Sequence, residues 1–175
     1  KTGMTIINRI LEGLPFRHAD RHLVACPLYH SGAQAFLNLM SGLGAEIHLL
    51  DSFDAERALE TMEQSRIHNA FLVPTMAQRI LNLPAHVLER HRPKDLNGLV
   101  FGAAPFPAEL RKRVMAYLGD VAYDFYGSTE TGWVTLANPQ DIRLPPDSVG
   151  KPIAGNEIKI LDESRNELPP GMVGE

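Results

Sequence analysis

Residues 96–125 read LNGLVFGAAPFPAELRKRVMAYLGDVAYDF, and this stretch contains two short apolar runs separated by a helical pattern. The runs Leu96–Phe101 and Ala122–Phe125 have the length and apolar composition of buried strands. The residues between them carry an apolar stripe at helical spacing, formed by Leu110, Val114 and Leu118. A strand, a helix and a second strand in this order are typical of a βαβ unit, whose two strands are parallel.

The ends of this central helix are marked by residues with positional preferences. Pro107 falls where a first-turn proline is expected, and Gly119 ends the apolar stripe. The basic run Arg111–Arg113 suits the C-terminal half of the helix dipole, and we interpret it as a solvent-exposed face.

The same alternation extends toward the N-terminus. Strands are predicted at Leu23–Cys26, Glu46–Leu50 and Ala70–Val73, and helices at Ser31–Leu43, after Asp54, and at Met76–Leu83. Asp54 is the expected N-cap of its helix, and Thr75 with Gln78 has the spacing of a capping box. We therefore predict an α/β fold with a mostly parallel sheet flanked by helices.

The composition changes beyond Trp133, where prolines accumulate and Glu157–Leu161 is the only strong periodic signal. This pattern predicts a change to a β-rich subdomain, with a boundary near residue 145. The expected organisation is a partial α/β subdomain at residues 1–145 and the beginning of a β-rich subdomain at 146–175. Because the chain starts inside a helical pattern and ends just after a Pro-Pro-Gly turn, we expect an internal fragment of a longer protein.

The composition excludes several classes of function. The net charge of −4 arises from 17 basic and 21 acidic residues spread along the 175-residue chain, which argues against nucleic acid as a partner. Cys26 is the single cysteine, so no internal disulfide can form, and a reducing compartment is expected. No apolar run approaches the roughly 20 residues of a membrane-spanning helix. These features predict a cytoplasmic protein without a transmembrane segment.

The residues that suggest chemistry lie in Asp124–Gly132, which is expected to leave a strand as a glycine-punctuated, hydroxyl-rich loop. Ligands of open α/β sheets bind at such strand ends. The ring of Tyr126 can stack on a nucleobase, Gly127 allows a phosphate to approach the backbone, Thr129 can donate to a phosphate oxygen, and Glu130 can hold Mg²⁺. Composition alone leaves an ordinary surface turn as the alternative.

Five segments resemble the adenylate-forming (AMP-binding) superfamily, and along the chain they follow one another in the order of the family's pattern. Residues 126–130 (YGSTE) resemble its Tyr-Gly-x-Thr-Glu signature, and residues 102–107 (GAAPFP) resemble its Gly-Gly-Ala-Pro loop. Residues 27–32 (PLYHSG) are similar to its Pro-Leu-aromatic-His segment. Residues 149–152 and 166–175 resemble the pattern that follows the signature. The serine in YGSTE favours the acyl-CoA synthetase, or acid:CoA ligase, branch.

The resemblance implies site residues. Its nucleotide-binding set is Gly102, Ala103, Ala104, Asp124, Phe125, Tyr126, Gly127, Ser128 and Thr129. It implies that Asp124 accepts from the adenine amino group, Tyr126 packs on the adenine, Thr129 contacts the α-phosphate and Glu130 binds Mg²⁺. Catalytic roles are implied for Thr129, Glu130 and His30.

The side chains of His30 and Trp133 each allow two interpretations. The resemblance implies that His30 faces the pocket of the acyl carboxylate, while the alternative is a half-buried histidine hydrogen-bonded at a strand end. Trp133 can line the acyl pocket, or it can belong to the core, where tryptophan is commonly buried.

The reaction implied by the resemblance uses ATP, Mg²⁺, CoA and a small-molecule carboxylic acid, and suggests a role in fatty acid metabolism. The carboxylate attacks ATP to give acyl-AMP and pyrophosphate, and CoA then displaces AMP. The family's phosphate loop, ribose-binding aspartate and C-terminal lysine are not among these residues, so the fragment alone is expected to be inactive. The alternatives are an adenylation domain that loads a carrier protein and a truncated, non-catalytic nucleotide-binding module.

Overall fold

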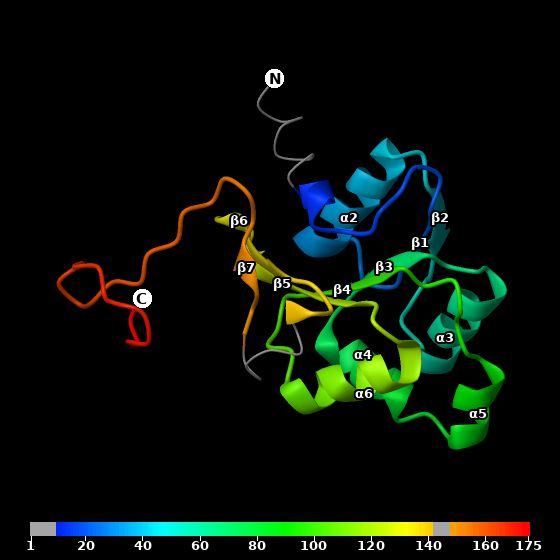
Figure 1. Cartoon of the computed structure of the whole chain (residues 1–175). Helices are drawn as coiled ribbons and strands as arrows, with labels where there is room; N and C mark the ends of the chain where they lie inside the picture. The colour runs from blue at the N-terminus through cyan, green and yellow to red at the C-terminus, as the bar shows by residue number, and fades with distance from the viewer. Residues whose placement is uncertain (1–9, 142–147) are drawn as a thin grey trace.

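The computed structural model describes residues 10–141 and 148–175, and its centre is one seven-stranded mixed sheet (Figure 1). The strand order is β2-β1-β3-β4-β5-β6-β7. The strands are β1 (Arg21–Val24), β2 (Glu46–Leu49), β3 (Asn69–Leu72), β4 (Gly98–Phe101), β5 (Ala122–Ser128), β6 (Gly132–Ala137) and β7 (Lys151–Pro152). Pairing is parallel from β2 through β5 and antiparallel between β5, β6 and β7.

Helices cover both faces of the sheet. They are α2 (Ser31–Gly42), α3 (Ala55–Gln64), α4 (Pro74–Leu81), α5 (Ala85–Arg90) and α6 (Ala108–Leu118). Helix α2 lies on one face, and α3, α4 and α6 lie on the other (Figure 1). The predicted α/β fold with a mostly parallel, helix-flanked sheet is confirmed. Helix α5 was not predicted.

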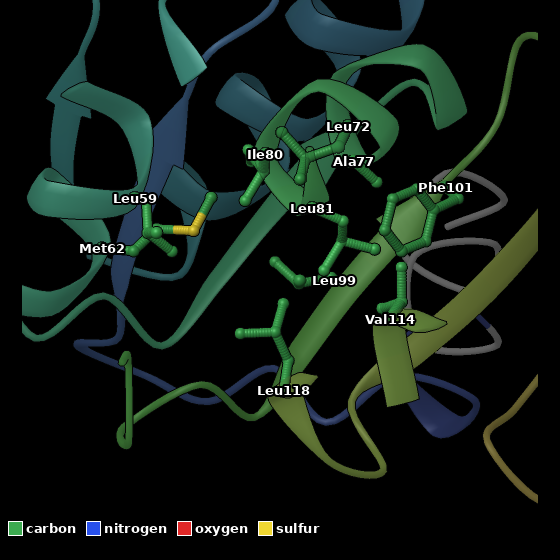
Figure 2. A pocket seen from close by; sticks show the side chains of 10 residues that line it. All are labelled: Leu59, Met62, Leu72, Ala77, Ile80, Leu81, Leu99, Phe101, Val114 and Leu118. Atoms are coloured by element: carbon green, nitrogen blue, oxygen red, sulfur yellow. The ribbon is translucent and has the colours of Figure 1, made fainter. Parts of the chain in front are cut away.

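The larger core lies beneath α3, α4 and α6, where apolar side chains from the helices meet those of β3 and β4 (Figure 2). Its members include Leu59, Met62, Leu72, Ile80, Leu99, Phe101 and Val114, all nearly inaccessible to solvent. A void of ≈ 10 Å³ remains among them. It is lined by apolar side chains and has about the size of one water molecule, so it is packing space and not a ligand site.

Two predicted helix ends are confirmed, and two were wrong. Asp54 caps α3 by accepting a hydrogen bond from the Arg57 amide at 2.9 Å, and Gly119 ends α6 with φ +85°. Helix α4 begins at Pro74 without a side-chain cap, so the proposed capping box at Thr75 is incorrect. Pro107 is the residue before α6 and not its first turn.

Strand β5 is longer than the apolar run that predicted it, because β6 provides an antiparallel partner. It continues to Ser128 and pairs with residues 132–137, so most of the expected loop is a β-hairpin. A register shift between Tyr126 and Gly127 marks a β-bulge, which bends the strand at this point.

Beyond β7 the chain runs away from the sheet as an irregular arm (Figure 1). Within it, Leu161 and Glu167 form an antiparallel bridge, and Leu161 exchanges two backbone hydrogen bonds with Glu175. The predicted subdomain boundary near residue 145 lies outside the described residues. None of the helices in the described ranges is long and apolar enough to cross a membrane.

A chain of buried polar side chains joins β1 to β3 at the edge opposite the strand ends that carry the signature. His22 Nδ1 lies 2.6 Å from Asn69 Oδ1, and the Asn69 amide donates to Asp20 Oδ2 at 2.9 Å. Because the Asn69 carbonyl can only accept, Nδ1 of His22 is the donor in this pair. Burial is the main cause that lowers the pKa of His22, and the Asn69 bond and the Asp20 charge oppose it.

We therefore expect the protein to lose stability as the pH falls below about 6.5, the pKa of an unfolded histidine. The unfolded chain takes up a proton there that folded His22 resists, so stability falls by up to about 1.4 kcal/mol per pH unit until the lowered pKa is reached. Urea unfolding between pH 5 and 8 measures this slope. His22→Asn should flatten it, whereas the exposed His86→Asn should not. Equal slopes in His22→Asn and wild type would contradict the assignment.

Candidate active site

The candidate site lies at the carboxyl edge of the central strands. Phe101, the last residue of β4, pairs with Asp124 of β5, so the loop that starts at Gly102 runs beside the signature hairpin. The first turn of α2, at Ser31, approaches the same edge from the face of the sheet that α2 covers. Strand ends and a helix N-terminus together form the usual ligand-binding position in open α/β sheets.

The loop 102–104 fits tightly against β5. A Cβ at Gly102 would lie 2.9 Å from the ring of Phe125 and 3.2 Å from its carbonyl oxygen. A larger residue at this position would therefore displace either the loop or β5. Ala103 has φ +65°, a left-handed conformation that is costly for a residue with a side chain. The loop thus keeps a strained backbone where it faces the hairpin.

The hairpin depends on Gly127. A Cβ at this position would lie 2.0 Å from the carbonyl oxygen of Gly132 on the opposite strand, closer than any real contact. Only glycine allows β5 and β6 to approach this closely. The packing of the hairpin therefore explains why the signature has a glycine at this position.

The turn after Gly127 is held by a small network of hydroxyl groups. Ser128 Oγ accepts from the amides of Glu130 and Thr131 at 3.2 and 3.1 Å, and Thr131 Oγ1 accepts from the Ser128 amide at 3.1 Å. The Glu130 carboxylate is exposed, and a hydrogen bond with the Ser128 side chain, together with a backbone bond, lowers the pKa of Glu130. The turn therefore presents an ionised carboxylate to solvent at neutral pH.

The turn also contacts helix α2. Thr129 Oγ1 lies 3.1 Å from Ser31 Oγ, although the two residues are 98 positions apart. Helix α2 has no acidic residue in its first turn and no side-chain cap on its N-terminal amides. Free amides at a helix N-terminus favour anions, so Thr129 lies beside a region suited to a phosphate or a carboxylate.

A first cavity of ≈ 430 Å³ opens between α2, the loop and the hairpin. Its lining includes the predicted site residues Ala103, Phe125, Gly127, Ser128, Thr129 and Glu130. Ser31, Phe71 and Trp133 also belong to the wall. Trp133 packs against Phe125 and Phe36 with ring centroids 4.4 and 5.0 Å away. It therefore belongs both to the cavity wall and to a second, smaller apolar core between α2 and the sheet.

A second cavity of ≈ 360 Å³ adjoins the first and shares Ser31, Gly32, Phe71 and Ala103 with it. His30 and Ala104 line it, and Cys26, Val73 and Met76 form an apolar part of its wall. Burial raises the pKa of Cys26 to about 11, so the thiol is neutral and forms part of an apolar wall. His30 is exposed to solvent, and the half-buried interpretation was wrong.

Three predicted residues lie outside both cavity linings. Gly102 is buried beneath Phe125, and Tyr126 stands 56% exposed at the end of β5. Asp124 is only 4% exposed, and its Oδ2 accepts a hydrogen bond from Arg111 at 2.5 Å. Burial raises the pKa of Asp124 to about 6, and the Arg111 charge opposes the rise. The carboxylate is thus ionised and paired at neutral pH.

The interpretation of Arg111–Arg113 as a solvent-exposed face was wrong for Arg111, which is only 3% exposed. Its position beside Leu110 in the apolar stripe, together with an acidic residue in a buried strand, was the available signal. Ser31 and Phe71 were also missed as site residues, because the spacing of α2 and β3 indicated only a helix start and a core position.

A magnesium ion fits this site only as a partner of a bound phosphate. No group of three or more His, Cys, Asp or Glu side chains in residues 10–141 and 148–175 is arranged to hold a metal ion. Glu130 offers one exposed, ionised carboxylate at the cavity wall. Mg²⁺ is commonly held by one or two carboxylates, with phosphate oxygens and water as its other ligands, so the residues fit the ion.

Sequence and structure comparisons agree with each other. The sequence profile described as "AMP-binding enzyme" matches residues 3–175. Feruloyl-CoA synthase of Amycolatopsis sp is 33% identical over 161 residues, which cover 89% of this chain and 32% of that protein. The fatty acid–[acyl-carrier-protein] ligase ScoC of Streptomyces coeruleorubidus is 28% identical over 169 residues, which cover 94% and 32%.

A solved structure shows the same arrangement of elements. The crystal structure of ATP-bound MatB from Rhodopseudomonas palustris superposes with a TM-score of 0.86 at 25% identity, covering 98% of this chain and 33% of that one. The chain therefore spans about a third of the length of the relatives it matches.

Proposed function

Because this chain belongs to the AMP-binding enzyme family, we propose that it is part of an ATP-dependent, AMP-forming acid:CoA ligase. Such a protein activates a carboxylic acid as acyl-AMP and transfers the acyl group to CoA. Since the chain spans about a third of its relatives, residues 1–175 by themselves are proposed to be inactive.

The observation that carries the proposal is the junction of the two cavities. The first is lined by Thr129 and Glu130, and the second by apolar side chains around Met76. Their shared wall is formed by Phe71, by Ala103 and by the start of α2, at Ser31 and Gly32. This arrangement suits a reaction in which a polar phosphate and the head of an apolar acid must meet at one point.

In this proposal the chain's own groups bind and orient the reactants. The Thr129 hydroxyl and the α2 amides donate hydrogen bonds to the α-phosphate as the carboxylate attacks it, and Ala103 borders both reactants. His30 screens the reacting carboxylate from solvent. When Mg²⁺ is bound, Glu130 would be its protein ligand, and the ion would neutralise phosphate charge as pyrophosphate departs. Orientation and charge neutralisation account for most of the acceleration of such reactions.

A carrier protein is the second candidate acceptor, and the similarity to ScoC favours it, because ScoC acts on an acyl carrier protein. The similarity to feruloyl-CoA synthase, at the higher identity of 33%, favours CoA. We propose CoA as the acceptor for this reason, with a carrier-protein ligase and a non-catalytic nucleotide-binding module as the alternatives.

The test is an assay of the full-length protein for pyrophosphate release from ATP and Mg²⁺ with a panel of aliphatic and aromatic carboxylic acids. We expect release with at least one acid and thioester formation with free CoA. Thioester formation only on a phosphopantetheinylated carrier protein would select the second candidate. Nucleotide binding without release for any acid would favour the non-catalytic module.

For Tyr126→Ala we expect an increase of about tenfold in the KM for ATP, because a ring stacked on a base contributes about equally in the ground and transition states. The kcat should change little, and Tyr126→Phe, which keeps the ring, should behave as wild type. Steady-state pyrophosphate release at varied ATP measures both constants. A large fall in kcat at unchanged KM would assign Tyr126 a different role.

A further inference from the structure

The ring of Phe71 is the bulky part of the wall that the two cavities share. Phe71 lies on β3, is only 5% exposed, and lines both cavities. Among the described residues, the other members common to both linings are Ser31 and Gly32 of α2 and Ala103 of the loop after β4. These three are small, so Phe71 is the member of the shared wall whose side chain can reach across the gap between α2 and the loop.

The position of this ring is fixed by close contacts on both of its edges. A Cβ at Gly32 would lie 2.9 Å from ring atoms Cε1 and Cζ, and a Cβ at Gly102 would lie 3.3 Å from Cε2. Since Cε1 and Cε2 belong to opposite edges, the ring spans the distance from the first turn of α2 to the loop after β4. Its face stacks on Phe36 with the centroids 4.8 Å apart and the planes 12° from parallel. In so close-packed a setting the ring keeps its place, and it is a fixed barrier.

The barrier divides surfaces of different chemistry. On one side the first cavity contains the hydroxyl groups and the carboxylate of the turn, at Ser128–Glu130. On the other side the second cavity has an apolar wall that includes Val73 and Met76. An apolar ligand in the second cavity therefore has room on one side of the Phe71 ring. Without the ring, the spaces on the two sides would join.

We infer that Phe71 is a specificity-determining residue that limits the size of the carboxylic acid by keeping the two cavities apart. The inference rests on the proposed function, in which the apolar body of the acid occupies the second cavity. A close-fitting apolar pocket discriminates about 10- to 200-fold for one methylene group. The wild type should therefore prefer one narrow range of acid lengths and lose affinity steeply beyond it.

The test uses Phe71→Ala and Phe71→Leu in the full-length protein. Calorimetric Kd values are measured for straight-chain alkanoic and ω-phenylalkanoic acids of increasing length, and pyrophosphate release is measured with the same acids. We expect Phe71→Ala to bind the first acids that are too long for the wild type at least about tenfold more tightly than the wild type does. The preferred length should increase by about five carbons, because the deleted ring frees a comparable volume. Phe71→Leu should move the preference in the same direction by fewer carbons.

The matched control is Leu72→Ala. Leu72 is the next residue of β3 and is 1% exposed, but it packs into the larger core on the opposite face of the sheet. Its truncation also removes buried apolar volume, so it should lower the urea midpoint while the preferred acid length stays as in the wild type. Urea midpoints of all variants show that each one is folded. If Phe71→Ala does not fold, Phe71→Leu and Leu72→Ala together decide the question.

Each result decides the inference. An unchanged length preference in the folded Phe71 variants would overturn it, and so would an equal shift in Leu72→Ala, because general loosening of the fold would then be the cause. Wild-type protein that binds neither series of acids would also overturn it. Pyrophosphate release with an unchanged length profile would refute the role of Phe71 and leave the proposed ligase activity intact. Length-dependent binding that shifts in the Phe71 variants, without pyrophosphate release for any acid, would refute the ligase activity while the inference on Phe71 stands.

Discussion

Glu130→Gln is expected to lower the rate of adenylate formation in the full-length protein by on the order of 100-fold or more. Glutamine keeps the shape of the side chain but removes the negative charge, and this carboxylate is the group in the first cavity that fits a divalent cation. Its hydrogen bonds lie in an exposed turn, so the fold should be unaffected. Pyrophosphate release at saturating ATP, with Mg²⁺ varied, measures the effect.

Two comparisons make this prediction specific. The second half-reaction, started from acyl-AMP and CoA, needs no metal at a departing pyrophosphate and should slow much less. Glu163→Gln, which removes an exposed carboxylate from the arm after β7, should leave both half-reactions unchanged. If Glu130→Gln released pyrophosphate within about threefold of wild type, a difference of about 0.7 kcal/mol, Glu130 would be a structural residue of the turn and no metal ligand.

Gly127→Ala is expected to destabilise the hairpin and to reduce adenylate formation by about 100-fold. The new Cβ would lie 2.0 Å from the Gly132 carbonyl oxygen, a backbone atom that cannot turn aside. Overpacking of this kind costs about 3 kcal/mol at the upper end of the usual range. The strands must separate to relieve it, and a shift of about 1 Å in Thr129 and Glu130 is enough to cost 100-fold in rate.

Urea unfolding and pyrophosphate release together test the Gly127 prediction. Gly42→Ala is the matched control, because a Cβ there meets nothing within 4 Å and alanine is favoured in a helix by about 0.5–1 kcal/mol. It should be as stable as wild type or more so. Wild-type stability and activity in Gly127→Ala would show that the hairpin adapts, and that glycine is not required at the bulge.

The layered fold could be predicted because its signals are local. Short apolar runs at β3, β4 and β5 alternate with amphipathic helices, and Asp54 and Gly119 are caps whose preference comes from the adjacent backbone. The match of the family profile to residues 3–175 confirms the resemblance suggested by the signature segments.

The hairpin and the role of Arg111 could not be predicted because both depend on distant partners. Strand β5 extends past Phe125 only because β6 pairs with it, and the neighbouring prolines obscured the strand character of residues 132–137. A run of three cationic residues on a helix normally indicates a solvent-exposed face. Arg111 is buried because Asp124 of the next strand compensates its charge.

The wall shared by the two cavities divides the site into parts that can change independently in evolution. Cys26, Val73 and Met76 line only the second cavity, and the hairpin residues line only the first. Under the proposed function, mutations at these three positions would therefore alter the acids that are accepted without touching the groups assigned to ATP. Under that function, the range of acids could diversify by drift at a few apolar positions while the hairpin stays constant.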